Sequence, residues 1–321
     1  MGDFNFMISL IDESARIGAD GIKFQVLLDY DSFISIKHSM YDEFKKGMFT
    51  YEEWEKIFTH TKDKGLDIVF MPICKQSLTL VKSTTYKIDY IDIHSISFYD
   101  EEVLKCIRDT KLPIILGIGG RSIIEIDNKI QYFDSLIKVL MVGFQAFPTN
   151  IEDVKIEKIK WLKDKYPQLD IGFADHSAWD SEIAIKANEW ALILGATYFE
   201  KHLTIRPGED RWDWQSALHV DKCDVLIKSL RFLQDKVFGH PVKDYDKIEG
   251  KELIYRNRQK VVVANKDLAK GQKLCIHDIA FCMHDNGEGI TDGNFVLGKM
   301  LKINKHKGDI INNNDLYELI N

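Results

Sequence analysis

The chain has 321 residues, 45% of them hydrophobic, and a formal net charge of −7. This length suffices for one large domain of about 250 residues plus a small one. The acidic balance argues against a nucleic-acid partner, and no apolar run approaches the roughly 20 residues that span a bilayer, so no membrane partner is expected either. Five scattered cysteines without a Cys-x-x-Cys pair, and no basic segment typical of a signal peptide, predict a cytoplasmic protein.

The first element is predicted to be a helix, because Met7, Leu10, Ile11 and Ala15 share one helical face. Seven short apolar runs follow, and they cover residues 21–26, 67–71, 90–94, 113–118, 138–144, 170–175 and 196–202. The helical stretches between them include 51–64, 100–110 and 151–165. Strands that are apolar on both faces and alternate with helices predict a parallel sheet covered by helices. The near-regular spacing favours a closed α/β fold, the (β/α)8 TIM barrel.

Only seven strands are predicted, and a helix precedes them. We therefore expect that the first barrel strand is missing, through truncation or a late start, or that the barrel closes in an unusual way. A helix over 221–238 ends this barrel domain, which we place at residues 1–238. The polar segment 239–255 is predicted to be a linker.

Residues 256–321 have a different character, with short β-rich runs separated by turn signals. Lys270-Gly271 and Asp278-Ile279 recur as Lys307-Gly308 and Asp315-Leu316, each pair offset by 37 residues. A glycine turn that leads to a polar segment, used twice, predicts a small pseudo-symmetric β domain.

Barrel active sites form at the carboxyl ends of the strands, so the polar residues there are the candidates. They are Lys23, Gln25, Asp92, His94, Gln145, Asp175, His176, Glu200, Lys201 and His202. His176 and His202 end consecutive strands, which lie about 5 Å apart, so two imidazoles there can share one metal ion. Neutral imidazole suits transition metals better than magnesium or calcium. The alternative is that each histidine caps its strand and hydrogen-bonds locally.

Lys23 and Gln25 point the same way from one strand, and a lysine aimed into a barrel is costly unless it meets an anion. That anion is either a substrate phosphate or carboxylate, or a structural partner such as Glu200. The glycine-rich segment 117–125 precedes a helix, and its free amides beside Arg121 form either a phosphate site or a structural turn.

Four acidic residues, Glu200, Asp175, Asp210 and Asp213, are candidate acids or acceptors of substrate hydroxyls. The segment 206–218 is long, polar and aromatic, and it is predicted to be a loop over the barrel mouth. Its tryptophans either wall a pocket or pack beneath the loop.

Several segments, in this order, resemble the sialic acid synthase family, which includes synthases of other nonulosonic acids. In the barrel they are GADGIKFQ, ILGIGGRSIIEI, FPTNIEDVKIEKI, GFADHSAWD and GATYFEKHLT. RNRQKVVVANKDLAKGQKL and VLGKMLKINKHKGDII resemble the family's C-terminal antifreeze-like (SAF) domain. The resemblance covers almost the whole chain.

The resemblance implies condensation of phosphoenolpyruvate with an N-acylated aminohexose, which gives a nonulosonic acid and phosphate, in cell-surface polysaccharide biosynthesis. It implies a divalent metal, Mn²⁺ with Mg²⁺ or Co²⁺ as alternatives, held by His176 and His202 to polarise the sugar aldehyde. The implied catalytic residues are Lys23, Glu200 and Asp175. The implied substrate contacts are Gln25, Ser95, Arg121, Gln145, Asp210 and Asp213. Family members are homodimers, so a domain-swapped homodimer is expected.

The sequence departs from the family pattern at several positions. It has no counterpart of the first-strand motif A-E-I-G-x-N-H-x-G, Asp92 replaces a lysine, Met71 a threonine and Ala174 a serine. A reversed charge about 4 Å from a trianion shifts the interaction by several kcal/mol at an effective dielectric near 20, and Arg121 is placed to compensate. Two alternatives stay open: a metal-dependent aldolase, lyase or epimerase acting on another sugar acid, and a catalytically inactive sugar-binding paralogue. The retained His176 and His202 disfavour the second.

Overall fold

The computed structural model describes residues 2–83, 86–143, 146–238, 248, 250–256, 258–285 and 289–317. The chain divides into two compact units, Met1–His240 and Pro241–Asn321. Most of the predicted linker, residues 239–247 and 249, lies outside the described residues. A short helix, α11 (Lys251–Arg256), occupies its end.

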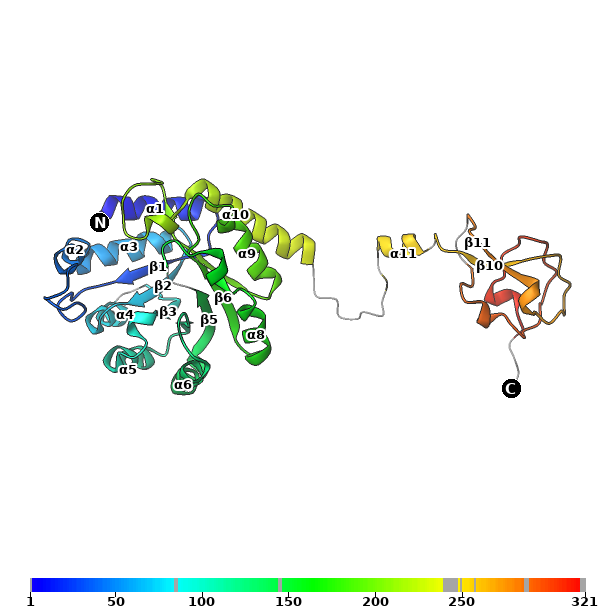
Figure 1. Ribbon diagram of the computed structural model, residues 1–321, viewed down its shortest axis with the longest axis horizontal. Helices are drawn as coiled ribbons and strands as arrows, with labels where there is room; N and C mark the ends of the chain where they lie inside the picture. The colour runs from blue at the N-terminus through cyan, green and yellow to red at the C-terminus, as the bar shows by residue number, and fades with distance from the viewer. Residues whose placement is uncertain are drawn as a thin grey trace. The chain divides into compact units, whose positions relative to one another are not determined.

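The first unit is built on a parallel sheet of seven strands in the order β1 to β7 (Figure 1). The strands are β1 (Gly21–Val26), β2 (Asp67–Pro72), β3 (Tyr90–Ile93), β4 (Ile114–Gly117), β5 (Ile137–Gly143), β6 (Asp170–Asp175) and β7 (Tyr198–Lys201). Each pairs with its neighbours in sequence, so the seven predicted strands are confirmed. Within the described residues β1 and β7 form no ladder with each other. The sheet curls as in a TIM-type barrel, so that its two edge strands come close enough for Lys23 and Glu200 to meet, but these strands are not joined by backbone hydrogen bonds.

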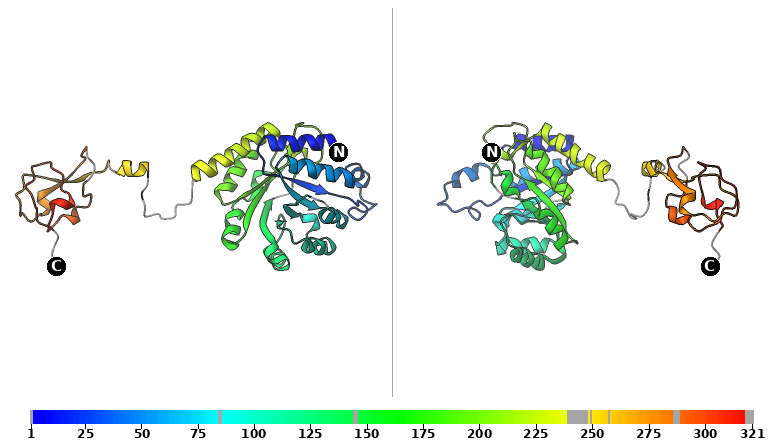
Figure 2. Two further views of the ribbon diagram at one scale, coloured as in Figure 1. Left: turned by 180° about the vertical axis from the view of Figure 1, so that it is seen from behind. Right: turned by 45° about the vertical axis from the view of Figure 1, so that its right-hand side comes forward.

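Helices cover the outer face of the curled sheet (Figures 1 and 2). They are α1 (Phe4–Arg16), α2 (Tyr41–Lys46), α3 (Tyr51–Asp63), α4 (Leu78–Ser83), α5 (Glu101–Thr110), α6 (Ile123–Phe133), α7 (Ile151–Val154), α8 (Lys158–Lys165), α9 (Ile183–Ile193) and α10 (Val220–Phe232). Capping boxes begin α3 at Thr50 and α6 at Ser122, because each side chain accepts the amide proton three residues on.

Two predicted helices differ from the observed ones. The stretch 151–165 is split into α7 and α8, because Lys155 adopts a left-handed conformation with φ of 45°. The stretch 221–238 is α-helical only as far as Phe232, and Leu233–Phe238 continue it as a π-helix.

The two unjoined strand edges are linked by side chains and helices. Inside the barrel, Lys23 of β1 forms an ion pair with Glu200 of β7. Outside, Ile17, directly after α1, packs in one apolar cluster with residues at the start of α10. Arg231 of α10 donates to the Gly18 carbonyl and to Asp20 at 2.8 and 2.9 Å. The amino-terminal helix therefore closes the barrel from outside.

The barrel interior is filled at one end and open at the other. Near the amino ends of the strands, the inward side chains form a small apolar cluster that includes Tyr90 and Tyr198, whose hydroxyls are 3.0 Å apart. Nearer the carboxyl ends, the inward positions of β4, β5 and β6 are Gly117, Gly143 and Ala174. A Cβ atom on Gly117 would lie 3.1 Å from the Ile93 carbonyl oxygen, so a side chain larger than that of glycine would crowd the neighbouring backbone at this position. The small residues leave a cavity at the carboxyl end.

The second unit confirms the predicted internal repeat as a pseudo-two-fold arrangement. The Gly271 amide donates to the Leu301 carbonyl at 2.7 Å, and the Gly308 amide donates to the Ala264 carbonyl at 2.8 Å. The two donors, Gly271 and Gly308, are 37 residues apart, and so are the two acceptors, Ala264 and Leu301. In one bond the first half of the unit donates to the second half, and in the other bond the second half donates to the first. Leu268 and Lys305, also 37 apart, exchange both backbone bonds with each other.

The same symmetry extends to the polar turns. Asp278 accepts from the Cys275 amide at 2.9 Å, and Asp315 accepts from the Asn312 amide at 2.8 Å. The unit contains one antiparallel strand pair, β10 (Val261–Ala264) with β11 (Ile279–Cys282). Its assignment as an antifreeze-like domain stays a prediction. In neither unit does a helix among the described residues have the length and apolar character needed to cross a membrane.

Candidate active site

A cavity lies at the carboxyl ends of the barrel strands, where the sequence predicts an active site. Its polar lining consists of Lys23, Asp92, His94, Ser95, His176 and Glu200. Small residues of β4 to β6 and Met141 make up most of the rest. Six of the seven strands or the loops directly after them contribute to this lining, as the topology of a curled parallel sheet requires.

His176 and His202 lie side by side, because each directly follows the end of its strand. Their ring centroids are 5.2 Å apart, and the Phe147 ring packs edge-on against both, at 5.1 and 6.0 Å. The His176 backbone is fixed, since its carbonyl accepts from the Thr149 amide at 2.8 Å and from the Ser216 hydroxyl at 2.7 Å. The predicted proximity of the two imidazoles is therefore confirmed.

The two imidazoles are suited to metal binding. Burial lowers the pKa of both, that of His202 to about 4, so both rings are neutral at physiological pH. The Nδ1 atom of His176 is buried without a hydrogen-bond partner among the described residues. Two neutral nitrogens fit a transition metal. The described part of the chain contains no cluster of three or more histidine, cysteine or acidic side chains that could hold an ion, so further ligands would be water or substrate oxygens.

Lys23 lies between two carboxylates on the cavity wall. Its ammonium is 2.5 Å from Glu200 and 3.8 Å from Asp92. Burial favours the neutral lysine, but the two carboxylates outweigh it and raise the pKa of Lys23. Burial also opposes ionisation of Glu200, yet the charge and hydrogen bond of Lys23 lower its pKa overall. Lys23 and Glu200 therefore form a charged pair inside the cavity, so the structural partner considered for Lys23 is present.

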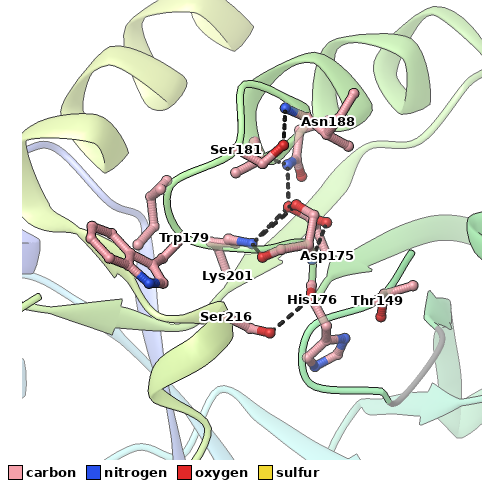
Figure 3. A network of polar contacts seen from close by, with 12 residues as sticks. Thr149, Asp175, His176, Trp179, Ser181, Asn188, Lys201 and Ser216 are labelled. Atoms are coloured by element: carbon pink, nitrogen blue, oxygen red, sulfur yellow. Dashed lines mark hydrogen bonds and ion pairs between the residues drawn. The ribbon is translucent and has the colours of Figure 1, made fainter. Parts of the chain in front are cut away.

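Asp175 does not line the cavity, and its catalytic role stays a prediction. Its carboxylate accepts from the Ser177 amide and hydroxyl, both at 2.9 Å, from Asn188 at 3.2 Å and from Lys201 at 2.8 Å. Figure 3 shows Lys201 and Asn188 directed toward Asp175, with the His176 ring on the other side of the strand end. These four hydrogen bonds hold the turn that positions His176, so the structure gives Asp175 a positioning role.

Replacing Asp175 by alanine is expected to destabilise the protein by about 3–5 kcal/mol. The reason is that the Lys201 side chain, 6% exposed, would lose its counter-charge. Denaturant unfolding measures this loss, and Asp175→Ala combined with Lys201→Met should recover part of it. Unchanged stability with lost turnover would instead support the catalytic role.

Of the other predicted site residues that the structure describes, only Ser95 lines the cavity. Gln25 is exposed, and Asp210 is exposed in the segment that follows the short strand β8 (Leu203–Thr204). Arg121 donates to the Ser95 carbonyl at 2.8 Å and stacks on Phe98. Asp213 lies 3.8 Å from His202 Nδ1. Gln145 lies outside the described residues.

The predicted mouth loop is anchored by one of its tryptophans. Trp212 packs on Phe44 of α2, with ring centroids 4.7 Å apart, while Arg211 stacks on Phe6 of α1. The packed alternative therefore holds for Trp212.

The sequence reasoning did not assign roles to His94 or to the cavity glycines. His94 lines the cavity, and burial lowers its pKa to about 4. It follows Asp92 by two residues, and this spacing was the available signal for a shared inward direction. Gly117 and Gly143 leave space for a ligand, and their signal was glycine at inward positions of otherwise apolar strands.

The curled parallel sheet, its outer helices and the polar cavity at the carboxyl strand ends define a barrel protein of the TIM type with an enzyme-like site. The NeuB family model matches residues 10–242, and the chain belongs to the NeuB family. This confirms the resemblance at the level of the family.

Characterised relatives match over most of their length. The N,N'-diacetyllegionaminic acid synthase of Campylobacter jejuni is 25% identical over 332 residues, which cover 97% of this chain and 95% of the relative. The pseudaminic acid synthase of that species is 24% identical over 84% of this chain and 80% of the relative. The crystal structure of an N-acetylneuraminic acid synthetase from Leptospira borgpetersenii, bound to citrate, has a TM-score of 0.70 and 25% identity, and covers 80% of this chain and 87% of that one.

Proposed function

We propose that this protein condenses phosphoenolpyruvate with an N-acylated aminohexose and forms a nonulosonic acid and phosphate. The observation that carries the proposal is the cavity in which the Lys23–Glu200 ion pair lies beside the His176 imidazole, against which the His202 ring packs. The chain belongs to the NeuB family, and two of its relatives are named as synthases of legionaminic and pseudaminic acid. Both findings support this reaction over other barrel chemistries. The product class suggests a role in cell-surface polysaccharide biosynthesis.

The proposed roles follow from where the side chains lie. His176 and His202 would hold a divalent metal, Mn²⁺ in the first instance, which polarises the aldehyde of the open-chain sugar when bound. Lys23 would bind an anionic oxygen of phosphoenolpyruvate, while Glu200 keeps the ammonium charged and oriented. In the reaction C3 of phosphoenolpyruvate bonds to C1 of the sugar, water adds at C2, and the C2–phosphate bond breaks. Asp213, whose carboxylate lies 3.8 Å from His202 Nδ1, would accept a hydrogen bond from a sugar hydroxyl.

The test is phosphate release from phosphoenolpyruvate by the full chain with Mn²⁺ and a panel of N-acyl hexosamines. We expect release with at least one sugar, and its loss when the sugar or the metal is left out. No release across the panel by a protein that binds Mn²⁺ would reject the condensation. The proposal includes a homodimer, which sedimentation equilibrium of the full chain tests.

One observation favours a second candidate, a metal-dependent enzyme that acts on a different sugar acid. The Asp92 carboxylate lines the cavity beside Lys23. When it is ionised it repels an anionic donor, and at about 4 Å with an effective dielectric near 20 this repulsion is about 4 kcal/mol per charge pair. Turnover of a sugar acid without phosphoenolpyruvate would select this candidate.

A further inference from the structure

The cavity wall holds one ammonium group against two carboxylates, and the two carboxylates are not equivalent. Glu200 has a direct hydrogen bond from Lys23 at 2.5 Å, whereas Asp92 is 3.8 Å from the same nitrogen. The Asp92 side chain is 1% exposed, and neither of its oxygens has a hydrogen-bond partner among the described residues. A buried carboxylate without donors strongly disfavours the ionised form. Asp92 is therefore the group of this trio that takes up a proton first.

Among the described residues that line the cavity, only Lys23 supplies a positive charge to Asp92. His94 on β3 and His176 after β6 line the same cavity and are neutral, because burial lowers the pKa of both. On β4 the register partner of Asp92 is the apolar Ile115, and the β4 and β5 residues that line the cavity are Gly117, Met141 and Gly143. Burial raises the pKa of Asp92 to about 6, opposed by the positive charge of Lys23 and reinforced by the negative charge of Glu200.

This arrangement conflicts with a negatively charged donor unless a proton is present. With Asp92 ionised, the Lys23, Asp92 and Glu200 side chains carry one net negative charge. With Asp92 protonated they are neutral, and a buried O–H group faces the cavity, where it can donate a hydrogen bond. A carboxylic acid kept neutral by its surroundings so that it can donate in this way is an established device in enzyme sites.

We propose that Asp92 is a specificity-determining residue that binds the anionic donor in its protonated form and donates a hydrogen bond to a carboxylate or phosphate oxygen. The inference rests on the proposed function, because phosphoenolpyruvate is the donor it concerns. The proton enters from solvent when the donor binds and returns to solvent when the donor leaves, and no covalent bond changes in this step.

The proposal predicts a definite pH dependence. Below about pH 6 Asp92 is already neutral, so donor affinity is independent of its ionisation. Above this pH the carboxylate must be protonated for binding, so the dissociation constant rises about tenfold per pH unit through this group. Near pH 8 each bound donor should therefore take up close to one proton at Asp92.

The test uses the full chain loaded with Mn²⁺ and phosphoenolpyruvate alone as the probe. Calorimetric titration in buffers of different ionisation enthalpy, from pH 5.5 to 8, gives the affinity and the number of protons taken up. Asp92→Asn is the matched variant, because the amide donates hydrogen bonds but does not titrate in this range. We expect proton uptake at pH 8 to be larger in the wild type by close to one, and the variant to bind more tightly than the wild type there.

Protons taken up by the phosphate group of phosphoenolpyruvate are the same in the wild type and in Asp92→Asn, so the difference between the two proteins removes them. Identical affinity and proton uptake in the two proteins would overturn the role of Asp92 and leave the proposed function intact. Failure of both to bind phosphoenolpyruvate at pH 6 would instead reject the proposed function and the donor contact with it.

A second measurement reports on the proton without any ligand. In the infrared spectrum of the wild-type protein, the carbonyl band of a protonated carboxyl group should appear as the pH falls through about 6. Subtraction of the Asp92→Asn spectrum assigns this band to Asp92. A carboxyl that titrates below pH 4 in the difference spectrum would contradict the proposal.

Discussion

Replacing His202 by alanine is expected to weaken Mn²⁺ binding by at least about 100-fold and to abolish metal-dependent turnover. Substitution of residues that merely orient a metal ligand costs about 10–100-fold in affinity, so loss of a ligand itself should cost at least as much. The described residues offer no cluster of three donors that could compensate, and His176→Ala should behave in the same way. Mn²⁺ electron paramagnetic resonance, which distinguishes free from bound ion, measures the affinity directly.

The matched control for this experiment is His94→Ala. His94 lines the same cavity, and its pKa is lowered by burial to the same value of about 4 as that of His202. It lies outside the proposed ligand pair, so its loss should change Mn²⁺ affinity by no more than a few-fold. Unchanged affinity in both His176→Ala and His202→Ala would reject the metal site.

The second large effect is expected for Lys23→Met. Removal of the ammonium leaves Asp92 and Glu200 in the barrel without their shared counter-charge, and breaking a buried pair in this way typically costs about 3–5 kcal/mol. The loss should depend on pH. Without Lys23, burial should raise the pKa of Glu200 and of Asp92 above their values in the unfolded chain, so the cost of keeping these carboxylates ionised in the folded variant grows as the pH rises. The variant should therefore be most destabilised near pH 7.5 and closer to the wild type near pH 5.

Urea unfolding at the two pH values measures this difference. Lys23→Met combined with Glu200→Gln removes both charges of the closest pair and should recover much of the stability while leaving donor binding weak. If Lys23→Met alone is as stable as the wild-type protein at pH 7.5, the two carboxylates do not depend on Lys23, and the charge balance inferred for the cavity is wrong.

The strands were predictable because their signal is local. Residues such as Phe24, Ile68 and Phe173 belong to short apolar runs that are buried under helices, and composition alone marks them. The break at Lys155 was not predictable in this way, because a left-handed lysine leaves no mark in the periodicity of its neighbours. The link between the edge strands β1 and β7 was not predictable either, because it depends on pairs such as Lys23 and Glu200 that lie far apart in the sequence. A local sequence pattern carries no information about such pairs.

The candidate site was predictable where direction follows from position on a strand. His176 and His202 were expected to meet, because adjacent parallel strands bring their carboxyl ends together. The partners of Asp175 were not predictable, because its sequence position marks it as a strand-end acid but does not reveal Lys201 and Asn188 beside it. The resemblance identified Asp92 as the residue that stands where the family pattern has a lysine. Only the three-dimensional structure shows that its two oxygens lack hydrogen-bond donors.

The exchanged bonds of the second unit mean that neither half of it is self-sufficient. The Gly271 amide donates to the Leu301 carbonyl and the Gly308 amide donates to the Ala264 carbonyl, so each half supplies a hydrogen-bond acceptor to the other half. Two separate copies of the half would satisfy the same bonds by associating as a symmetric pair. The two halves should therefore unfold together, because loss of one half leaves backbone groups of the other half unpaired.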